Sequence, residues 1–437
     1  MHRSPLDNDF QGDPRRQDDP TPQARHYDVV IIGAGAAGIA ACASLLKRRK
    51  SVRVCIVDPA TSHYYQPGWT MVGAGVFEPT STERPMASLI PDEVSWERAS
   101  AASFDPERHQ VTLDDGRSLG YSVLIVAPGL TLDWEAIPGL VETLGHNGVT
   151  SNYRFDLAPY TWTLVQGLRR GRALFTQPPM PIKCAGAPQK AMYLSADHWR
   201  RQGVLADIGI EFHTPGTALF GVPAYVPALM EYVERYRAQL NFGSTLVAVD
   251  GAQRLATFRQ VDPQGQTVER TEHFDMLHVC PPQKAPDFIR RSPLANEAGW
   301  VEVDEQTLCH TRYADVFALG DVSSTTNAKT AAAARKQAPV VAENALAHLD
   351  GKPLPAAYDG YGSCPLTVER GKIVLAEFGY GGKLLPSFPA WLLDGRKPSR
   401  LAWHLKAEGL PRLYWHAMLK GREWLCTPAA RPSSAAE

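Results

Sequence analysis

The chain has 437 residues, a hydrophobic content of 44%, a charged content of 21% and a formal net charge of -1. This composition lies in the globular range and excludes a collagen, a mainly disordered chain and a polytopic membrane protein. The balanced charge gives no electrostatic reason to bind nucleic acid, and we predict none. Seven cysteines are too few for a disulfide-stapled secreted domain, so the thiols need individual explanations.

The first 25 residues are polar, rich in proline and mixed in charge, and we expect a disordered tail. They contain no apolar run and many acidic residues, which predicts neither a secretory signal nor a transit peptide.

A strand, a glycine turn, a helix and a second strand follow the tail. The first strand spans residues 27–32, the helix extends to about residue 49, and the second strand spans residues 52–57. The turn has the spacing GxGxxG and an acidic residue follows the second strand, a pattern typical of a βαβ unit that binds an adenine dinucleotide. The residues of this predicted site are Gly33, Gly35, Ala36, Ala37, Gly38 and Asp58.

Each position of this turn has a physical role. Gly33 permits the tight turn, Gly35 lets the backbone approach a pyrophosphate, and Gly38 lets the helix pack closely on the strand. The helix N-terminus offers N–H groups to the phosphates. Asp58 is placed to accept hydrogen bonds from ribose hydroxyls.

Two later segments favour FAD as the dinucleotide. VLIVAPG at residues 123–129 and TRYADVFALGD at residues 311–321 resemble the accessory fingerprints of flavoproteins with two dinucleotide domains, although Pro128 replaces the usual threonine. A helix expected to start near residue 329 would place its positive end at the flavin. The further predicted flavin contacts are Gln66, Ala127, Gly129, Gly320, Asp321, Lys329 and Thr330.

The middle of the chain lacks the second glycine turn that a nicotinamide dinucleotide would need. The strand at residues 172–176 runs into QPPMPIKCAGAPQK, which contains no GxGxxG. We therefore predict that NAD(P)H is not the electron donor.

The seven cysteines divide into two groups. We interpret Cys42, Cys55, Cys280 and Cys309 as small buried hydrophobic residues, and Cys426 as an exposed residue of a polar tail. Cys184 and Cys364 instead lie in loops flanked by proline and glycine. Cys184 precedes a helix expected at about residues 188–202, whose N-terminus would lower the pKa of the thiol. Sequence alone leaves open whether the two thiols meet, because geometry decides that.

Five segments resemble the sulfide:quinone oxidoreductases, in the branch that includes the mitochondrial enzyme. They are HYYQPGWTMVGAG at 63–75, PIKCAGAPQKAMYL at 181–194, NAKTAAAA at 327–334, SCPL at 363–366 and VLAEFGY at 374–380. The resemblance implies a redox pair of Cys184 and Cys364 that oxidises hydrogen sulfide, with the persulfide on Cys364 and Cys184 released as a thiolate. It also implies non-covalent FAD, a membrane quinone that takes the electrons, and a thiol, sulfite or cyanide that takes the sulfur.

The C-terminal region predicts contact with a membrane surface. From residue 386 to about residue 425, tryptophan and leucine alternate with lysine and arginine, as in amphipathic helices at an interface. Helices packed on the domain or on a dimer face are the alternative, and a homo-oligomer stays open. Phe378, Tyr380 and Tyr414 are the candidate quinone contacts. We expect a peripheral protein of a bacterial inner (cytoplasmic) membrane, and the sequence leaves the membrane face open.

The predicted fold class is α/β with two Rossmann-like domains. The FAD domain covers residues 26–152 and 276–355, the second Rossmann-like domain covers 153–275, a redox-loop and membrane region covers 356–425, and a tail covers 426–437. His63 has no neighbours at ligand spacing, and we predict no metal. The competing functions are an NADH:quinone reductase of the same fold, a flavocytochrome-type sulfide dehydrogenase, and a flavin-bound sulfur sensor without turnover.

Overall fold

The computed structural model describes residues 25–261 and 265–431. The tail predicted for residues 1–25 lies outside the described residues, apart from Arg25, which begins the first strand.

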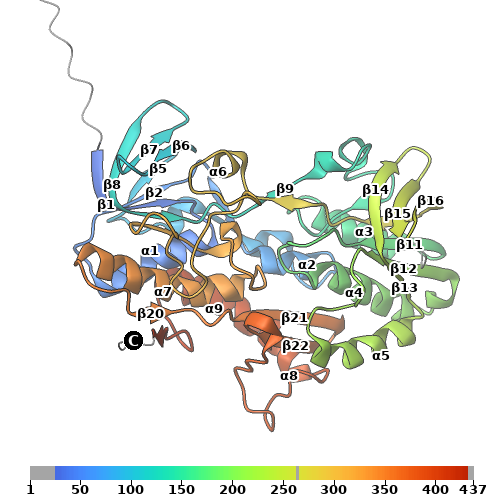
Figure 1. The fold of residues 1–437 in the computed structure, drawn as a ribbon. Coiled ribbons are helices and arrows are strands. Elements are labelled where there is room, and N and C mark those ends of the chain that lie inside the picture. The colour runs from blue at the N-terminus through green and yellow to red at the C-terminus, as the bar shows by residue number, and fades with distance from the viewer. Residues whose placement is uncertain (1–24, 262–264, 432–437) are drawn as a thin grey trace, which may run out of the picture.

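The first Rossmann-like unit is built on a seven-stranded sheet, at the left of Figure 1. Its order is β5 (Ser95–Glu97), β2 (Val54–Val57), β1 (Arg25–Ile32), β8 (Ser118–Val126), β7 (Gln110–Leu113) and β6 (Ala101–Asp105), and β19 (Val316–Ala318) also pairs with β8. β1 is parallel to β2 and β8, and β19 continues the parallel set from far along the chain. The FAD fold is therefore completed by a strand from the last third of the sequence.

Two alanine-rich helices cover this sheet. They are α1 (Ala36–Arg48) and α7 (Ala331–Leu349). Their small side chains let them pack closely against each other, and both contribute to the core formed with β1 and β8. α7 begins where the sequence predicts, because the Thr330 hydroxyl accepts the Ala333 N–H at 3.1 Å and caps the helix.

The second Rossmann-like unit contains a parallel five-stranded sheet. Its order is β10 (Val149–Thr150), β17 (Met276–His278), β11 (Gly171–Thr176), β12 (Ile208–Thr214) and β13 (Gln239–Phe242). Its helices are α3 (Ala158–Gly167), α4 (Ala187–Arg201) and α5 (Val226–Tyr236), and an antiparallel sheet follows with β14 (Ser244–Asp250), β15 (Leu255–Val261) and β16 (Thr267–His273). The predicted fold class is thus confirmed.

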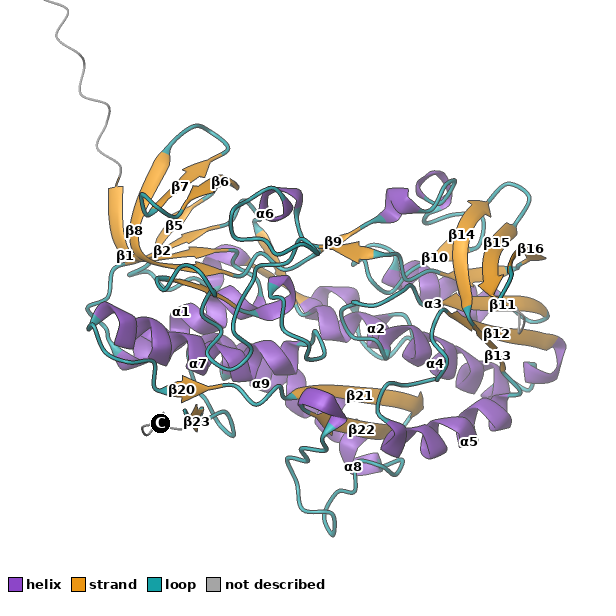
Figure 2. Cartoon of the chain, viewed as in Figure 1, coloured by secondary structure: helices purple, strands orange, loops and turns teal. Residues whose placement is uncertain are grey.

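A hairpin links the second unit to the C-terminal region. It consists of β21 (Gly362–Glu369) and β22 (Lys372–Phe378), and it packs beside α4 and α5 (Figure 2). The chain then forms α8 (Arg400–His404), a π-helical turn (Leu405–Gly409) and α9 (Leu410–His416). In the part of the chain that the structure describes, every helix is too short or too polar to cross a bilayer.

The remaining elements are short. They are the strand pairs β3 (Ser62–Tyr64) with β4 (Glu83–Pro85), β9 (Thr131–Leu132) with β18 (Gln283–Lys284) and β20 (Ala356–Ala357) with β23 (Ala429–Ala430), and the helices α2 (Trp69–Val72) and α6 (Asp287–Arg290).

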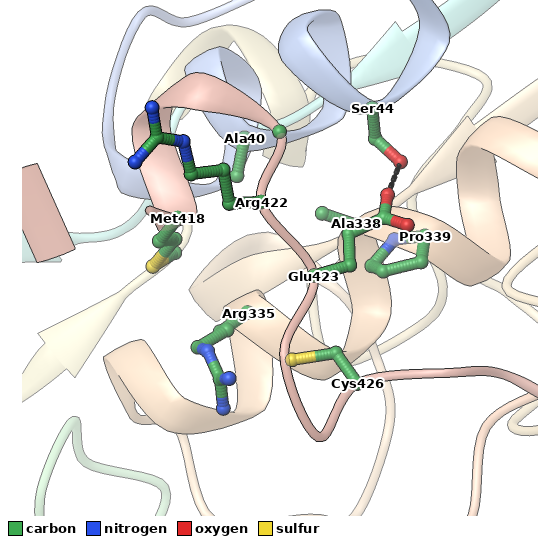
Figure 3. A pocket seen from close by; sticks show the side chains of 10 residues that line it. Ala40, Ser44, Arg335, Ala338, Pro339, Met418, Arg422, Glu423 and Cys426 are labelled. Atoms are coloured by element: carbon green, nitrogen blue, oxygen red, sulfur yellow. Dashed lines mark hydrogen bonds between the residues drawn. The ribbon is translucent and has the colours of Figure 1, made fainter. Parts of the chain in front are cut away.

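The end of the chain differs from the predicted polar tail. Its residues return to α1 and α7 and line a small cavity there, where Ser44 donates to Glu423 at 2.5 Å (Figure 3). Cys426 is only 1% exposed, not exposed as predicted, because it lies at the same cavity against residues of α1 and α7. Cys42, Cys55, Cys280 and Cys309 are buried as predicted.

Candidate functional site

The predicted phosphate turn has the geometry that a pyrophosphate needs. Gly33 has φ +99°, and a Cβ atom there would lie 2.5 Å from the Ala127 carbonyl oxygen. At Gly38 a Cβ would lie 1.9 Å from the Gly33 oxygen, so only glycine allows the helix to approach the strand this closely. Around Gly35 the space is open for 4 Å, as a cradle for a ligand requires.

The accessory segments converge on the same turn. Ala127 and the following turn, with Gly129 at φ +77°, lie against Gly33 at the end of β8. Gly320, at φ +74°, approaches Ala37 of α1, with 2.9 Å between the Ala37 Cβ and a Cβ placed at Gly320. Asp58 accepts the backbone N–H groups of Ala34, at 2.6 Å, and Ala60, at 2.8 Å, at the same edge of the sheet.

Polar groups beyond the turn also fit FAD. The Asp321 carboxylate accepts no hydrogen bond from residues 25–261 and 265–431, and burial raises its pKa against the charges of Lys183 and Lys329. Buried atoms at Trp69 Nε1, Thr70 Oγ1 and the Asn152 amide lack a hydrogen-bond partner among the described residues. Such groups cost free energy unless a ligand or water satisfies them.

Two lysines lie near this acidic group. The Lys183 amine donates to Gln66 Oε1 and lies 5.6 Å from the centre of the Trp69 ring. The Lys329 amine donates to the Ser323 carbonyl at 2.8 Å, and burial lowers its pKa to about 8. Lys329 is therefore a buried group beside Asp321 and not a solvent lysine.

The two loop cysteines lie together in the structure. The sulfur atoms of Cys184 and Cys364 are 3.7 Å apart, although the two residues are 180 positions apart in the sequence. Cys184 lies just before α4, at the place where β11 leads into the helix, and Cys364 lies near the start of β21. This loop occupies the position at which a dinucleotide-binding unit carries its glycine turn.

The backbone of Cys184 is held firmly. Its φ of +51° is unusual for a residue other than glycine. Its N–H donates to the Lys329 carbonyl at 2.8 Å, and its carbonyl accepts the N–H of Ala187 at 2.7 Å and the Tyr153 hydroxyl at 3.2 Å. The Cys184 loop is thereby tied to the segment that leads into α7.

Charges near the pair favour the thiolate of Cys184. A hydrogen bond from the Cys364 thiol, with the charge and hydrogen bond of Lys190, holds the pKa of Cys184 well below its usual value, against the effect of burial. The Lys190 amine lies 3.2 Å from the Cys184 sulfur. The Cys184 thiolate and burial raise the pKa of Cys364. The two cysteines thus have opposite tendencies to ionise.

A second cation comes from the C-terminal region. Lys406, in the π-helical turn, is only 2% exposed and donates to the Pro67 carbonyl at 2.8 Å. Burial and the charge of Lys190 lower the pKa of Lys406 to about 7, while the cysteines oppose this change. The surroundings of the two cysteines therefore combine α4, β21 and a residue close to the end of the chain.

Glycine allows the two cysteines to approach each other. A Cβ atom at Gly186 would lie 2.5 Å from the Cys364 sulfur and 2.4 Å from a Leu366 methyl group. Our sequence reasoning missed Gly186, Lys190 and Lys406. The first two lie in the quoted segment PIKCAGAPQKAMYL, whereas nothing in the local sequence distinguishes Lys406 from the surrounding basic residues.

Comparisons with known proteins identify the family. The model of the pyridine nucleotide-disulphide oxidoreductases matches residues 27–165. The chain is 39% identical to the mitochondrial sulfide:quinone oxidoreductase of Mus musculus, over 83% of this chain and 80% of the relative. It is 40% identical to the corresponding protein of Dictyostelium discoideum, over 90% of this chain and 86% of the relative. The chain belongs to the sulfide:quinone oxidoreductase family.

The fold agrees with that of this family. The solved structure of the sulfide:quinone oxidoreductase from Aquifex aeolicus matches with a TM-score of 0.74 and 18% identity, over 92% of each chain. Sulfide:quinone oxidoreductases are flavoproteins, and FAD as the cofactor agrees with the cradle of Gly33, Gly35 and Gly38.

The expected location on a bacterial inner membrane is wrong. The sulfide:quinone oxidoreductases of mouse and Dictyostelium are mitochondrial, which points to the mitochondrion. Our expectation relied on the acidic residues at positions 1–25. The similarity to the mitochondrial proteins instead extends over 83% to 90% of the chain.

The three candidate quinone contacts have different surroundings. Phe378 packs edge-on against Phe220, with 5.8 Å between ring centres. The Tyr380 hydroxyl donates to the Glu305 carbonyl at 2.7 Å. Tyr414 is buried, and its hydroxyl lies 2.7 Å from His63 Nε2. Their assignment to the quinone stays a prediction.

Proposed function

We propose that Cys184 and Cys364 form the redox pair with which this chain oxidises sulfide and reduces a membrane quinone. The observation that carries the proposal is the 3.7 Å separation of the two sulfur atoms beside the Lys190 amine. A shift of about 1.7 Å would bring them to the length of a disulfide bond, about 2.05 Å.

The different ionisation of the two thiols assigns their roles. Hydrosulfide attacks the Cys364 sulfur of the disulfide, the bond between the cysteines breaks, and Cys184 leaves as a thiolate. Thiols with a lower pKa leave faster in such an exchange, and the Cys184 thiol has the lowered pKa. Lys190 stabilises the departing charge from 3.2 Å. The new sulfur–sulfur bond is a persulfide on Cys364.

A small nucleophile then removes the sulfane sulfur. A thiol, sulfite or cyanide attacks the outer sulfur of the persulfide and leaves Cys364 as a thiolate. The two cysteine thiolates next close the disulfide again, which releases two electrons. A flavin held at the turn of Gly33, Gly35 and Gly38 would supply the two-electron acceptor between the cysteines and the quinone. The chain contributes a fixed Cys184 backbone and the buried Lys190 ammonium, which favours the anionic states.

The proposed function can be tested by following the flavin absorbance under anaerobic conditions. Sulfide should bleach the flavin of the purified protein, and a short-chain quinone should restore it. Cys184→Ser and Cys364→Ser should both lose the response, whereas Cys309→Ser, at a buried cysteine outside the pair, should retain it. Bleaching by NADH and not by sulfide would instead favour an NADH:quinone reductase. Sulfide binding without quinone reduction would favour a sulfur sensor.

We also propose that the loop between β22 and α8 contacts the membrane. It protrudes at the bottom of Figure 1, with Trp391 85% exposed and Leu392 47% exposed, and Leu401 of α8 is 49% exposed. Exposed basic residues accompany them: Lys383, Arg396, Lys397 and Arg400. Apolar side chains with surrounding positive charge suit an anionic lipid surface.

Packing distinguishes this loop from α9, which we had also expected at the interface. Tyr414 and Trp415 of α9, with Met418 and Leu419 after it, are buried in the core of the first unit. In co-sedimentation with vesicles of neutral and anionic phospholipids, replacement of Trp391 and Leu392 by serine should reduce binding. Trp424→Ser, at a tryptophan that is 62% exposed elsewhere, is the matched control. Equal binding of both variants would contradict the proposal.

A further inference from the structure

The redox pair sits at one end of two elements that run side by side. Cys184 precedes α4 and Cys364 lies near the start of β21, and side chains of the two elements share one core. From Gly186 to Asp197 the helix rises about 17 Å, and from Cys364 to Arg370 the strand extends about 20 Å. The two elements therefore reach similar distances from the cysteines.

A charged cluster joins the opposite ends of these elements. Asp197 is 1% exposed, and its carboxylate accepts the backbone N–H of Arg370 at 3.1 Å, in the hairpin turn after β21. Arg200 and Arg201 each pair with the same carboxylate at 3.0 Å. We call Asp197 together with Arg370, Arg200 and Arg201 the far clamp.

The last residue of β21 strengthens the far clamp. Glu369 pairs with Arg235 of α5 at 3.1 Å, with Lys372 at 2.8 Å and with Arg200 at 3.9 Å. Removal of the buried Asp197 carboxylate would leave the Arg370 N–H unpaired, which is costly, whereas the partly exposed arginines would stay hydrated. The register of β21 on α4 is thus fixed at this end by specific bonds and not by apolar packing alone.

At the cysteine end the two residues have different freedom. The Cys184 backbone is held by the carbonyl of Lys329 and by the N–H of Ala187. Cys364 lies in a two-stranded hairpin, so its position along α4 depends on how the whole hairpin is seated. A shift of the hairpin along its axis would move the Cys364 sulfur away from Cys184.

We propose that Asp197 is a positioning residue that sets the approach of Cys364 to Cys184 from the far end of α4. This inference rests on the proposed role of the two cysteines as a redox pair. It predicts that the far clamp favours closure of the disulfide, because it holds the two thiols near bonding distance before the bond forms. Without the clamp the disulfide should open more readily to a reducing thiol.

The test measures the thiol–disulfide equilibrium of the holoenzyme. The protein is equilibrated anaerobically with glutathione buffers, quenched by alkylation, and analysed by mass spectrometry for the peptide that joins Cys184 to Cys364. Asp197→Ala should lower the equilibrium constant for closing the disulfide about tenfold, which corresponds to about 30 mV. Asp197→Asn keeps an oxygen for the Arg370 N–H but loses the charge that pairs with the arginines, so its constant should lie between those of the wild type and Asp197→Ala.

Two further variants keep the outcome decisive. Glu369→Ala weakens the clamp from the strand and should lower the equilibrium constant in the same direction, so it decides the matter if Asp197→Ala does not fold. Glu211→Gln is the control, because it weakens the pairs with Arg172 and His213 on the sheet of the same unit. Equal constants for Asp197→Ala, Glu369→Ala and the wild type would overturn the positioning role. Absence of the disulfide in the wild type at any glutathione ratio would instead overturn the proposed redox pair.

Discussion

The cation beside the redox pair permits a quantitative prediction. Lys190 is 2% exposed, and its amine lies 3.2 Å from the Cys184 sulfur. Burial opposes its charge, yet the two cysteines outweigh burial and raise the pKa of Lys190 from 10.5 to about 12. The difference of about 1.5 pH units corresponds to roughly 2 kcal/mol of net stabilisation of the charged pair.

The same interaction must also affect the pKa of the Cys184 thiol. Coupling between two titrating groups is reciprocal, so Lys190→Met should raise the pKa of Cys184. Methionine has a similar length and no charge, so it removes the cation without opening a large cavity.

The assay is the pH dependence of alkylation in the reduced protein. Cys184 is only partly buried, whereas burial raises the pKa of Cys42, Cys55 and Cys280 to about 12 each. Iodoacetamide should therefore label Cys184 first, and in Lys190→Met the midpoint of its pH profile should move upward. Lys352→Met removes an exposed lysine paired with Asp350 and should leave the midpoint unchanged. An unchanged midpoint in Lys190→Met would show that the Cys364 hydrogen bond and the start of α4 suffice for the thiolate.

Three other substitutions test separate parts of the site. Gly186→Ala places a Cβ 2.5 Å from the Cys364 sulfur. It should lower sulfide-dependent quinone reduction by more than about tenfold while the flavin stays bound. Gly221→Ala, which has open space around it, should leave this activity unchanged. Gly38→Ala places a Cβ 1.9 Å from the Gly33 oxygen and should yield protein with a reduced ratio of flavin to protein absorbance; Gly209→Ala, with 3.7 Å of clearance, is its control, and full flavin content in Gly38→Ala would refute the cradle. Lys406 has a pKa of about 7 in the folded protein and about 10.4 when unfolded, so between these values the unfolded chain binds more protons and the free energy of unfolding rises with pH. In chemical denaturation the wild type should therefore gain stability relative to Lys406→Met from pH 7 to pH 10, and parallel curves for the two proteins would contradict the buried, poorly protonated lysine.

The sequence predicts the fold around the glycine turn well because its signals are local. The strand, glycine turn and helix at Gly33 to Gly38 lie within one βαβ unit, and their spacing alone constrains the backbone. Ala127 and Gly320 come from distant segments, yet each ends a buried strand of the same parallel sheet, so both are expected at the same edge.

The contact between Cys184 and Cys364 was harder to predict from the sequence because it depends on tertiary packing. The approach of Cys184 to Cys364 is set by how the β21–β22 hairpin lies on α4, and no local pattern encodes that contact. Lys406 resembled the other basic residues of an interfacial segment until the fold placed it beside Pro67. The aromatic residues at positions 414 and 415 have a composition that suits a membrane surface or a core equally well, and packing against the first unit decided for the core.

The contribution of Lys406 has a consequence for how the enzyme matures. A ribosome releases Cys184 and its helix long before it releases the π-helical turn that carries Lys406, and domains of a nascent chain fold in the order of synthesis. Until the turn docks, the incomplete site lacks the buried Lys406 amine and also lacks Cys364. The nascent thiol is then a poorer nucleophile and has no partner with which to close a bond. Full sulfur reactivity would thus arise only in the finished polypeptide, which would protect newly made chains from adventitious oxidants and mixed disulfides.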